Sequence, residues 1–117
     1  MDIAVAYYTA MAAKNITGME KYLHTDVLLI TPLAEVTSKE AVLEAAKKLI
    51  TFLKTIRIRA KFCSDDQVML AYDFDFPAPI GLLRAAALMT LQDELITKIE
   101  LFYDGRPFDM KKNEIFS

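Results

Sequence analysis

The chain has 117 residues, of which 54% are hydrophobic, and this amount of apolar material fits one compact domain over residues 1–117. Its net charge of -2, with basic residues dispersed among acidic ones, lacks the basic footprint of a nucleic-acid-binding protein. A single cysteine cannot form an internal disulfide, and a single histidine leaves mostly carboxylates to bind a metal ion. We therefore predict no metal ion and no other cofactor.

The beginning of the chain has no basic segment leading into an apolar signal core. Charges at Asp26, Glu35, Arg84 and Asp93 interrupt the apolar runs well before the ~20 residues that a membrane-spanning helix needs. We expect a cytoplasmic protein with no membrane contact.

Three helices are predicted in the N-terminal half. Residues 2–13 are rich in alanine and begin with an acidic residue, which favours a helix start. Residues 17–23 predict a short helix leading into a strand at residues 27–30, which Pro32 ends. Thr37 and Glu40 fit a capping box, and the helix continues to about Leu53. Its apolar side chains recur at three- and four-residue spacing, which predicts one buried face made of Val42, Ala45, Ala46, Leu49, Ile50 and Leu53.

Four strands are predicted in the C-terminal half. From residue 55 the hydrophobic period changes from roughly 3.6 to 2, over residues 55–63, 68–76, 82–92 and 96–104. The turns after the first and third of these strands are short and polar, whereas residues 77–81 form a longer corner. Successive strands with such connections predict an antiparallel meander.

Charge pairing predicts the register of the two hairpins. With three-residue loops the ionised side chains share one face, as Arg59 opposite Asp73, Arg57 opposite Asp75 and Arg84 opposite Asp104. The same register pairs Ile58 with Phe74, Ala60 with Tyr72, Ala87 with Leu101 and Met89 with Ile99. The second face then collects Leu70, Tyr72, Phe74, Ala85, Ala87, Met89, Ile99, Leu101 and Tyr103. Small Ala85 and Ala87 among large neighbours predict a ligand pocket under the helices, and a filled core is the alternative.

Several segments occur in the order and spacing of a known family. They are Tyr7-Tyr8, residues 22–27, Thr31-Pro32-Leu33, residues 38–42 and the ending at residues 96–104. Together they resemble the SnoaL-like, or nuclear transport factor two-like, superfamily over nearly the whole chain. The resemblance implies an α+β, cystatin-like cone, in which a strongly curved antiparallel sheet carries three helices of the N-terminal half on its concave face.

The superfamily includes polyketide cyclases, ketosteroid isomerases, limonene epoxide hydrolases and non-enzymatic modules, so the fold alone does not give an activity. Tyr7 matches the oxyanion-binding tyrosine of the isomerases, whereas Thr31 and Ala87 occupy the positions of their base and their protonated acid. The water-activating relay of the epoxide hydrolases falls on Tyr72, Phe74 and Leu101. Both catalytic sets are therefore incomplete.

The resemblance and the inner face together predict a pocket protein that binds a hydrophobic, ring-containing or acyl ligand. Whether it is an isomerase- or cyclase-type enzyme stays open. If it catalyses a reaction, we expect Tyr7 and Tyr103 to assist proton transfer or cyclisation, with His24 as the base. A structural hydrogen bond to backbone is the alternative for His24, and Tyr8 fits packing or binding. The expected ligand-binding residues are Tyr7, Met11, Leu70, Tyr72, Phe74, Ala87, Met89, Leu101 and Tyr103.

Ala86, Leu88 and Phe102 fall among the charges of the outer face, where an apolar strip predicts a partner. Members of the superfamily commonly pair through this face, so we expect a homodimer. Two other functions stay open: a non-enzymatic dimeric binding or scaffolding module whose interior is only a core, and a divergent ketosteroid-isomerase-like or epoxide-hydrolase-like enzyme.

Overall fold

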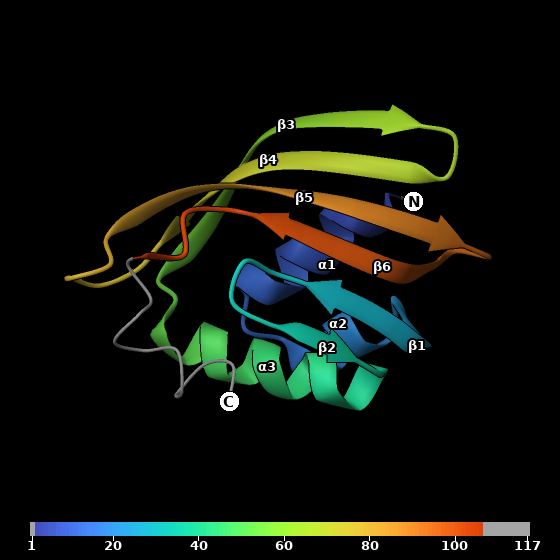
Figure 1. Ribbon diagram of the computed structural model, residues 1–117, viewed down its shortest axis with the longest axis horizontal. Helices are drawn as coiled ribbons and strands as arrows, with labels where there is room; N and C mark the ends of the chain where they lie inside the picture. The colour runs from blue at the N-terminus through green and yellow to red at the C-terminus, as the bar shows by residue number, and fades with distance from the viewer. Residues whose placement is uncertain (1, 107–117) are drawn as a thin grey trace.

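The computed structural model describes residues 2–106, which form three helices packed against one sheet of six strands (Figure 1). The helices are α1 (Ile3–Ala12), α2 (Ile16–Glu20) and α3 (Lys39–Phe52). The strands are β1 (Leu23–Ile30), β2 (Glu35–Thr37), β3 (Thr55–Ser64), β4 (Gln67–Asp75), β5 (Leu82–Gln92) and β6 (Leu95–Phe102). Among residues 2–106, no helix is long and apolar enough to cross a lipid bilayer.

The strand order in the sheet is β2-β1-β6-β5-β4-β3. The predicted antiparallel meander from β3 to β6 is confirmed. However, β1 pairs with β6 in parallel, so the sheet is mixed and its two edges, β2 and β3, do not meet. The short strand β2 was not predicted, because three residues are too few to show an alternating pattern of apolar and polar side chains. Figure 1 shows the strongly bent sheet arching over α1, with α3 packed beneath β1 and β2.

Side-chain hydrogen bonds cap the N-termini of α1 and α3. The Asp2 carboxylate accepts a hydrogen bond from the Val5 backbone N–H at 3.2 Å, which confirms the acidic start of α1. The predicted cap of α3 was wrong by one residue, because Thr37 is the last residue of β2 and the Ser38 hydroxyl accepts the N–H of Ala41 at 3.2 Å. The predicted buried face of α3 is confirmed at every position, namely Val42, Ala45, Ala46, Leu49, Ile50 and Leu53.

The predicted register of the β3–β4 hairpin was wrong by two residues over the first half of β3. Beyond the bulge it was wrong by one residue, because Ala60 lies opposite Ala71 where we expected Tyr72. Arg57 lies opposite Asp73, where we expected Asp75, and Ile58 lies opposite Tyr72. Two features produce the shift: only Asp65 and Asp66 form the loop, and the register changes between Ile58 and Ala60. The predicted ion pair nevertheless forms, because the Arg59 Nε atom lies 3.0 Å from Asp73 Oδ1.

The predicted register of the β5–β6 hairpin is confirmed where it matters for the core, with Ala87 opposite Leu101 and Met89 opposite Ile99. The pairing of Arg84 with Asp104 was wrong. Strand β6 ends at Phe102, and beyond it Asp104 pairs with Arg106, whose Nη2 lies 2.6 Å from Asp104 Oδ2. Arg84 instead lies opposite Asp73 on β4.

The predicted sidedness of the sheet is confirmed. The face under the helices buries Leu70, Tyr72, Phe74, Ala85, Ala87, Met89 and Ile99, and Leu101 and Tyr103 are half-buried at its end. The other face carries Arg57, Asp73 and Arg84, together with Phe102, which is 51% exposed. The hydrophobic core therefore lies between the concave face of the sheet and the helices, as the resemblance implied.

Candidate functional site

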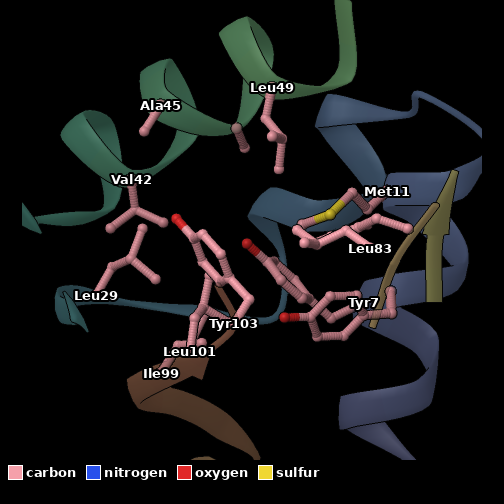
Figure 2. Close-up of a pocket in the computed structure, with 13 residues that line it drawn as sticks. Tyr7, Met11, Leu29, Val42, Ala45, Leu49, Leu83, Ile99, Leu101 and Tyr103 are labelled. Atoms are coloured by element: carbon pink, nitrogen blue, oxygen red, sulfur yellow. The ribbon is translucent and has the colours of Figure 1, made fainter. Parts of the chain in front are cut away.

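A partly enclosed cavity of about 40 Å³ lies between α1, α3 and the concave face of the sheet (Figure 2). Helix α1 contributes Tyr7, Tyr8 and Met11. Tyr7 and Met11 are four residues apart, and Tyr8 and Met11 are three apart, so the three side chains lie on one side of the helix. Helix α3 contributes Val42, Ala45, Ala46 and Leu49 by the same rule. The sheet and its flanks complete the lining with Leu29, Phe74, Leu83, Ile99, Leu101 and Tyr103.

Aromatic rings form a continuous row along one wall of this cavity and into the core. The rings of Tyr7 and Tyr8 meet edge to face at 5.5 Å between centroids. Tyr8 then contacts Tyr72 at 4.8 Å, and Tyr72 contacts Phe74 at 4.8 Å, again edge to face. Such ring pairs have the geometry that the aromatic quadrupole favours, so the row fixes the orientation of each phenol.

The electrostatics of the cavity are those of neutral hydroxyl groups. Burial, followed by the neighbouring phenols, raises the pKa of Tyr7 and Tyr8 well above the usual value for tyrosine. Burial does the same to the pKa of Tyr72, although the hydrogen bond with Tyr8 opposes it. These phenols therefore stay protonated at neutral pH, where they can donate hydrogen bonds but cannot act as bases.

Tyr103 stands at the far side of the cavity, with its hydroxyl directed toward α3 beside Val42 (Figure 2). Burial raises the pKa of its phenol, and a hydrogen bond with the Thr31 side chain opposes that shift. The Thr31 hydroxyl itself holds a turn: it donates to the carbonyl oxygen of Ala34 at 3.2 Å and accepts the N–H groups of Leu33 and Ala34 at 3.1 and 2.9 Å. Thr31 is thus a structural hydroxyl that also interacts with Tyr103, a residue of the cavity lining.

His24 lies on β1 and is not among the residues that line the cavity. Its Nδ1 atom accepts a hydrogen bond from the backbone N–H of Asp26 at 2.9 Å, so a neutral imidazole carries its proton on Nε2. This contact is the backbone hydrogen bond that was the alternative to a catalytic role. The structure does not bring His24 together with Tyr7 and Tyr103.

The predicted ligand-binding residues separate into two groups. Tyr7, Met11, Phe74, Leu101 and Tyr103 line the cavity. The others lie deeper in the core and are wholly buried, namely Leu70, Tyr72, Ala87 and Met89. Sequence reasoning placed the α3 residues on a buried face but did not assign them to the cavity. The adjacent small residues Ala45 and Ala46 were the signal that α3 leaves space there.

No group of three or more His, Cys, Asp or Glu side chains within residues 2–106 is arranged to hold a metal ion. Among the described lining residues, the tyrosines carry hydroxyl groups and the other side chains are apolar.

Comparison with known proteins identifies the family. The family model described as a SnoaL-like domain matches residues 4–99. No curated protein sequence matches the chain. Among solved structures, a protein from Kribbella flavida DSM 17836 is 20% identical, with a TM-score of 0.87 over 96% of this chain and 92% of that chain.

Two further structures have a name that suggests an activity. A candidate polyketide cyclase from Sinorhizobium meliloti is 14% identical, with a TM-score of 0.81 over 87% of this chain and 94% of that chain. A steroid delta-isomerase from Pseudomonas aeruginosa is 13% identical, with a TM-score of 0.79 over 95% of this chain and 86% of that chain. At these identities the likeness establishes a shared α+β fold of the nuclear transport factor two-like type. With the family model covering most of the sequence, the chain belongs to the SnoaL-like domain family.

Proposed function

We propose that this chain binds a small hydrophobic molecule, ring-containing or acyl, in the cavity between α1, α3 and the sheet. One observation carries the proposal: the lining is apolar, and its polar side-chain groups are the tyrosine hydroxyls of Tyr7, Tyr8 and Tyr103. Apolar walls with a few fixed polar groups are the usual form of a small-molecule site. The cyclase and isomerase names of two structural neighbours are consistent with such a ligand.

The size of the cavity sets a condition on binding. An engineered apolar cavity of about 150 Å³ accommodates benzene. The cavity here measures about 40 Å³, so a ring-containing ligand must widen it. Met11 has a flexible thioether side chain, and Leu101 and Tyr103 are only half-buried. Ligand entry that displaces these three side chains leaves the sheet and α3 in place.

The chemistry that the site supports is hydrogen-bond donation. In this proposal, Tyr7 and Tyr103 donate to a carbonyl or hydroxyl oxygen of the ligand, and such donors stabilise negative charge that develops there during isomerisation or cyclisation. The lining within residues 2–106 contains no carboxylate and no imidazole to take up a proton. In this proposal, proton transfer runs through the ligand itself or through water, and we assign His24 a structural role only.

The cavity can be tested by filling it. Replacing Ala46 with leucine adds volume to the lining, whereas Ala13→Leu makes the same change at an exposed position. We expect steroids, polyketides or terpenoids that raise the thermal midpoint of the wild type and of Ala13→Leu to have no effect on Ala46→Leu, because a ligand stabilises only the state that binds it. Circular dichroism checks that the filled variant is folded. An equal thermal shift in both variants places the ligand elsewhere and contradicts the proposal.

A dimeric module is a second candidate, supported by the outer face of the sheet. The observed register places Phe62, Met69 and Leu88 in one row across β3, β4 and β5. A neighbouring row joins Ala71, Ala86 and Phe102. Phe62 is 67% exposed and Phe102 is 51% exposed, so this apolar surface has no cover within residues 2–106. We propose that a second copy of the chain covers it.

A further inference from the structure

The lining of the cavity is less well covered on one side than on the others. Among the lining residues that the structure describes, Leu101 and Tyr103 are half-buried, and every other one is buried. Leu101 lies near the C-terminal end of β6, and Tyr103 lies directly beyond that end. The shortest cover between the cavity and solvent is therefore at the end of β6. We call this side of the cavity, defined by Leu101 and Tyr103, the mouth.

Tyr103 is placed where it can move without disturbing the sheet. The pairing of β5 with β6 ends with Ala86 opposite Phe102, one residue before Tyr103. Figure 2 shows the Tyr103 side chain reaching across the cavity, with its hydroxyl beside Val42 on α3. Because the strand pairing stops at Phe102, a movement of Tyr103 leaves the hydrogen bonds between β5 and β6 intact. Local openings of this kind cost much less free energy than unfolding of the core.

The turn at residues 31–34 holds Tyr103 across the mouth. The Tyr103 hydroxyl interacts with the Thr31 side chain. Two residues later, the backbone of Gly105 lies so close to the same turn that an added Cβ atom would be 3.0 Å from Leu33 Cδ2. The turn itself is fixed by hydrogen bonds, because the Thr31 hydroxyl contacts Leu33 and Ala34 and the Thr31 N–H group donates to the Ala34 carbonyl oxygen at 2.8 Å. The turn is therefore the fixed side of the mouth, and Tyr103 is the side that can move.

We propose that Tyr103 is the gate of the cavity. Its ring closes the mouth, and a turn of the ring away from Val42 admits a small molecule while the helices and the sheet keep their places. The gate opens in the native state, because it releases one half-buried side chain and one hydroxyl contact. The inference rests on the proposed small-molecule function, which requires an entrance, and it adds the route of entry and the residue that controls it.

A thiol placed behind the gate tests the route without any ligand. In a Cys63→Ser background, which removes the exposed native thiol, Val42→Cys puts a thiol beside the Tyr103 hydroxyl. Val27→Cys is the matched control, because Val27 is also buried but lies outside the lining. The reagent is methyl methanethiosulfonate, and mass spectrometry follows the rate of modification at urea concentrations below the unfolding transition. Ala45→Cys repeats the test at a second lining position.

The dependence on urea distinguishes the gate from unfolding. Opening of the gate exposes little surface, so we expect the rate for Val42→Cys to change little with urea. Val27→Cys becomes accessible only when the protein unfolds, so its rate should rise steeply with urea.

Three further changes, each combined with Val42→Cys, test the role of Tyr103. Tyr103→Ala removes the ring that closes the mouth, and we expect modification to become about tenfold faster or more. Tyr103→Phe keeps the ring and removes the hydroxyl that interacts with Thr31, so we expect a rise of about threefold. Tyr22→Ala removes a half-buried tyrosine outside the cavity and should leave the rate unchanged. Urea denaturation of each variant separates a change in global stability from a change at the gate.

The outcomes separate the gate from the function on which it rests. If Tyr103→Ala leaves the rate for Val42→Cys unchanged, the cavity is reached by another route and the gate is overturned. If Val42→Cys and Val27→Cys show the same steep dependence on urea, the cavity opens only by unfolding, which also overturns the gate. A gate that passes both tests, together with a ligand screen that gives no thermal shift, would count against the small-molecule function alone.

Discussion

The hydroxyl oxygens of Tyr8 and Tyr72 lie 3.3 Å apart in the core, where one phenol donates a hydrogen bond to the other. The two residues come from α1 and β4, so this contact joins the first helix to the middle of the sheet. Because both side chains are buried, each hydroxyl depends on the other for its hydrogen bond.

Removing both hydroxyls of this pair should cost less than the sum of the losses from removing each alone. In Tyr72→Phe, the Tyr8 hydroxyl stays buried without its partner, and we expect the free energy of unfolding to fall by about 1–3 kcal/mol. The double variant Tyr8→Phe/Tyr72→Phe should lose less than the sum of the two single variants, because it buries no unsatisfied group. Urea denaturation of the four proteins measures this coupling. Strictly additive losses would show that the hydrogen bond contributes nothing.

The buried phenols should make the protein sensitive to alkali. Burial raises the pKa of Tyr7, Tyr8, Tyr72 and Tyr103, so the folded state keeps these protons when the unfolded state begins to lose them. Their contribution to stability is complete below the unfolded pKa of about 10 and is lost as pH rises from there toward the folded values. We expect most of the tyrosinate absorbance to appear together with the loss of helical circular dichroism. Ionisation of all five tyrosines near pH 10 in a folded protein would contradict the burial of the cluster.

The N-terminus of α3 offers a test between two adjacent hydroxyls. Ser38→Ala removes the acceptor for the Ala41 N–H group, and we expect the free energy of unfolding to fall by about 1 kcal/mol. Thr37→Ala is the matched control, because Thr37 lies in β2 and does not cap the helix. Ser38 has a φ angle of 88°, so Ser38→Gly should cost less than Ser38→Ala. Thermal or urea unfolding of the three variants measures the differences. If Thr37→Ala lowers the free energy of unfolding more than Ser38→Ala does, Thr37 is the residue that caps α3.

The apolar rows of the outer face can be tested through association. Phe102→Asp places a charge in one of the two apolar rows of the proposed dimer surface, and we expect light scattering to give the mass of a monomer while the wild type gives that of a dimer. Thr17→Asp adds the same charge to an exposed position on α2 and should leave the dimer intact. A wild type that is monomeric at all concentrations, or a Phe102→Asp variant of unchanged size, refutes the proposed interface.

The strand register shows where sequence reasoning was limited. Arg57 was placed two residues away from its observed partner on β4, yet its side chain still faced the correct way. A shift of two residues preserves the face of every side chain, whereas a shift of one reverses it. The length of the loop and the bulge near Arg59 depend on the backbone geometry of single residues. The alternation of apolar and polar residues along a strand carries no information about that geometry.

The cavity shows a second limit. Tyr7, Met11 and Phe74 were assigned to a pocket from their face of α1 and β4, and they do line it. Ala87 was expected to leave the space, but it is wholly buried, and the space lies nearer to Ala45 and Ala46 on α3. Which small residue leaves a gap depends on how closely the facing element approaches, and no local pattern records that distance.

The sequence by itself determined the helices, the meander, the family and the inward direction of the apolar and aromatic side chains, because each follows from periodicity or from the order of short motifs. Only the tertiary structure decided the parallel pairing of β1 with β6, the separation of His24 from Tyr7, and the mutual hydrogen bond of Tyr8 with Tyr72. These three features join residues far apart in the chain. Their geometry is fixed by how the helices dock on the bent sheet, a result of packing the whole core at once.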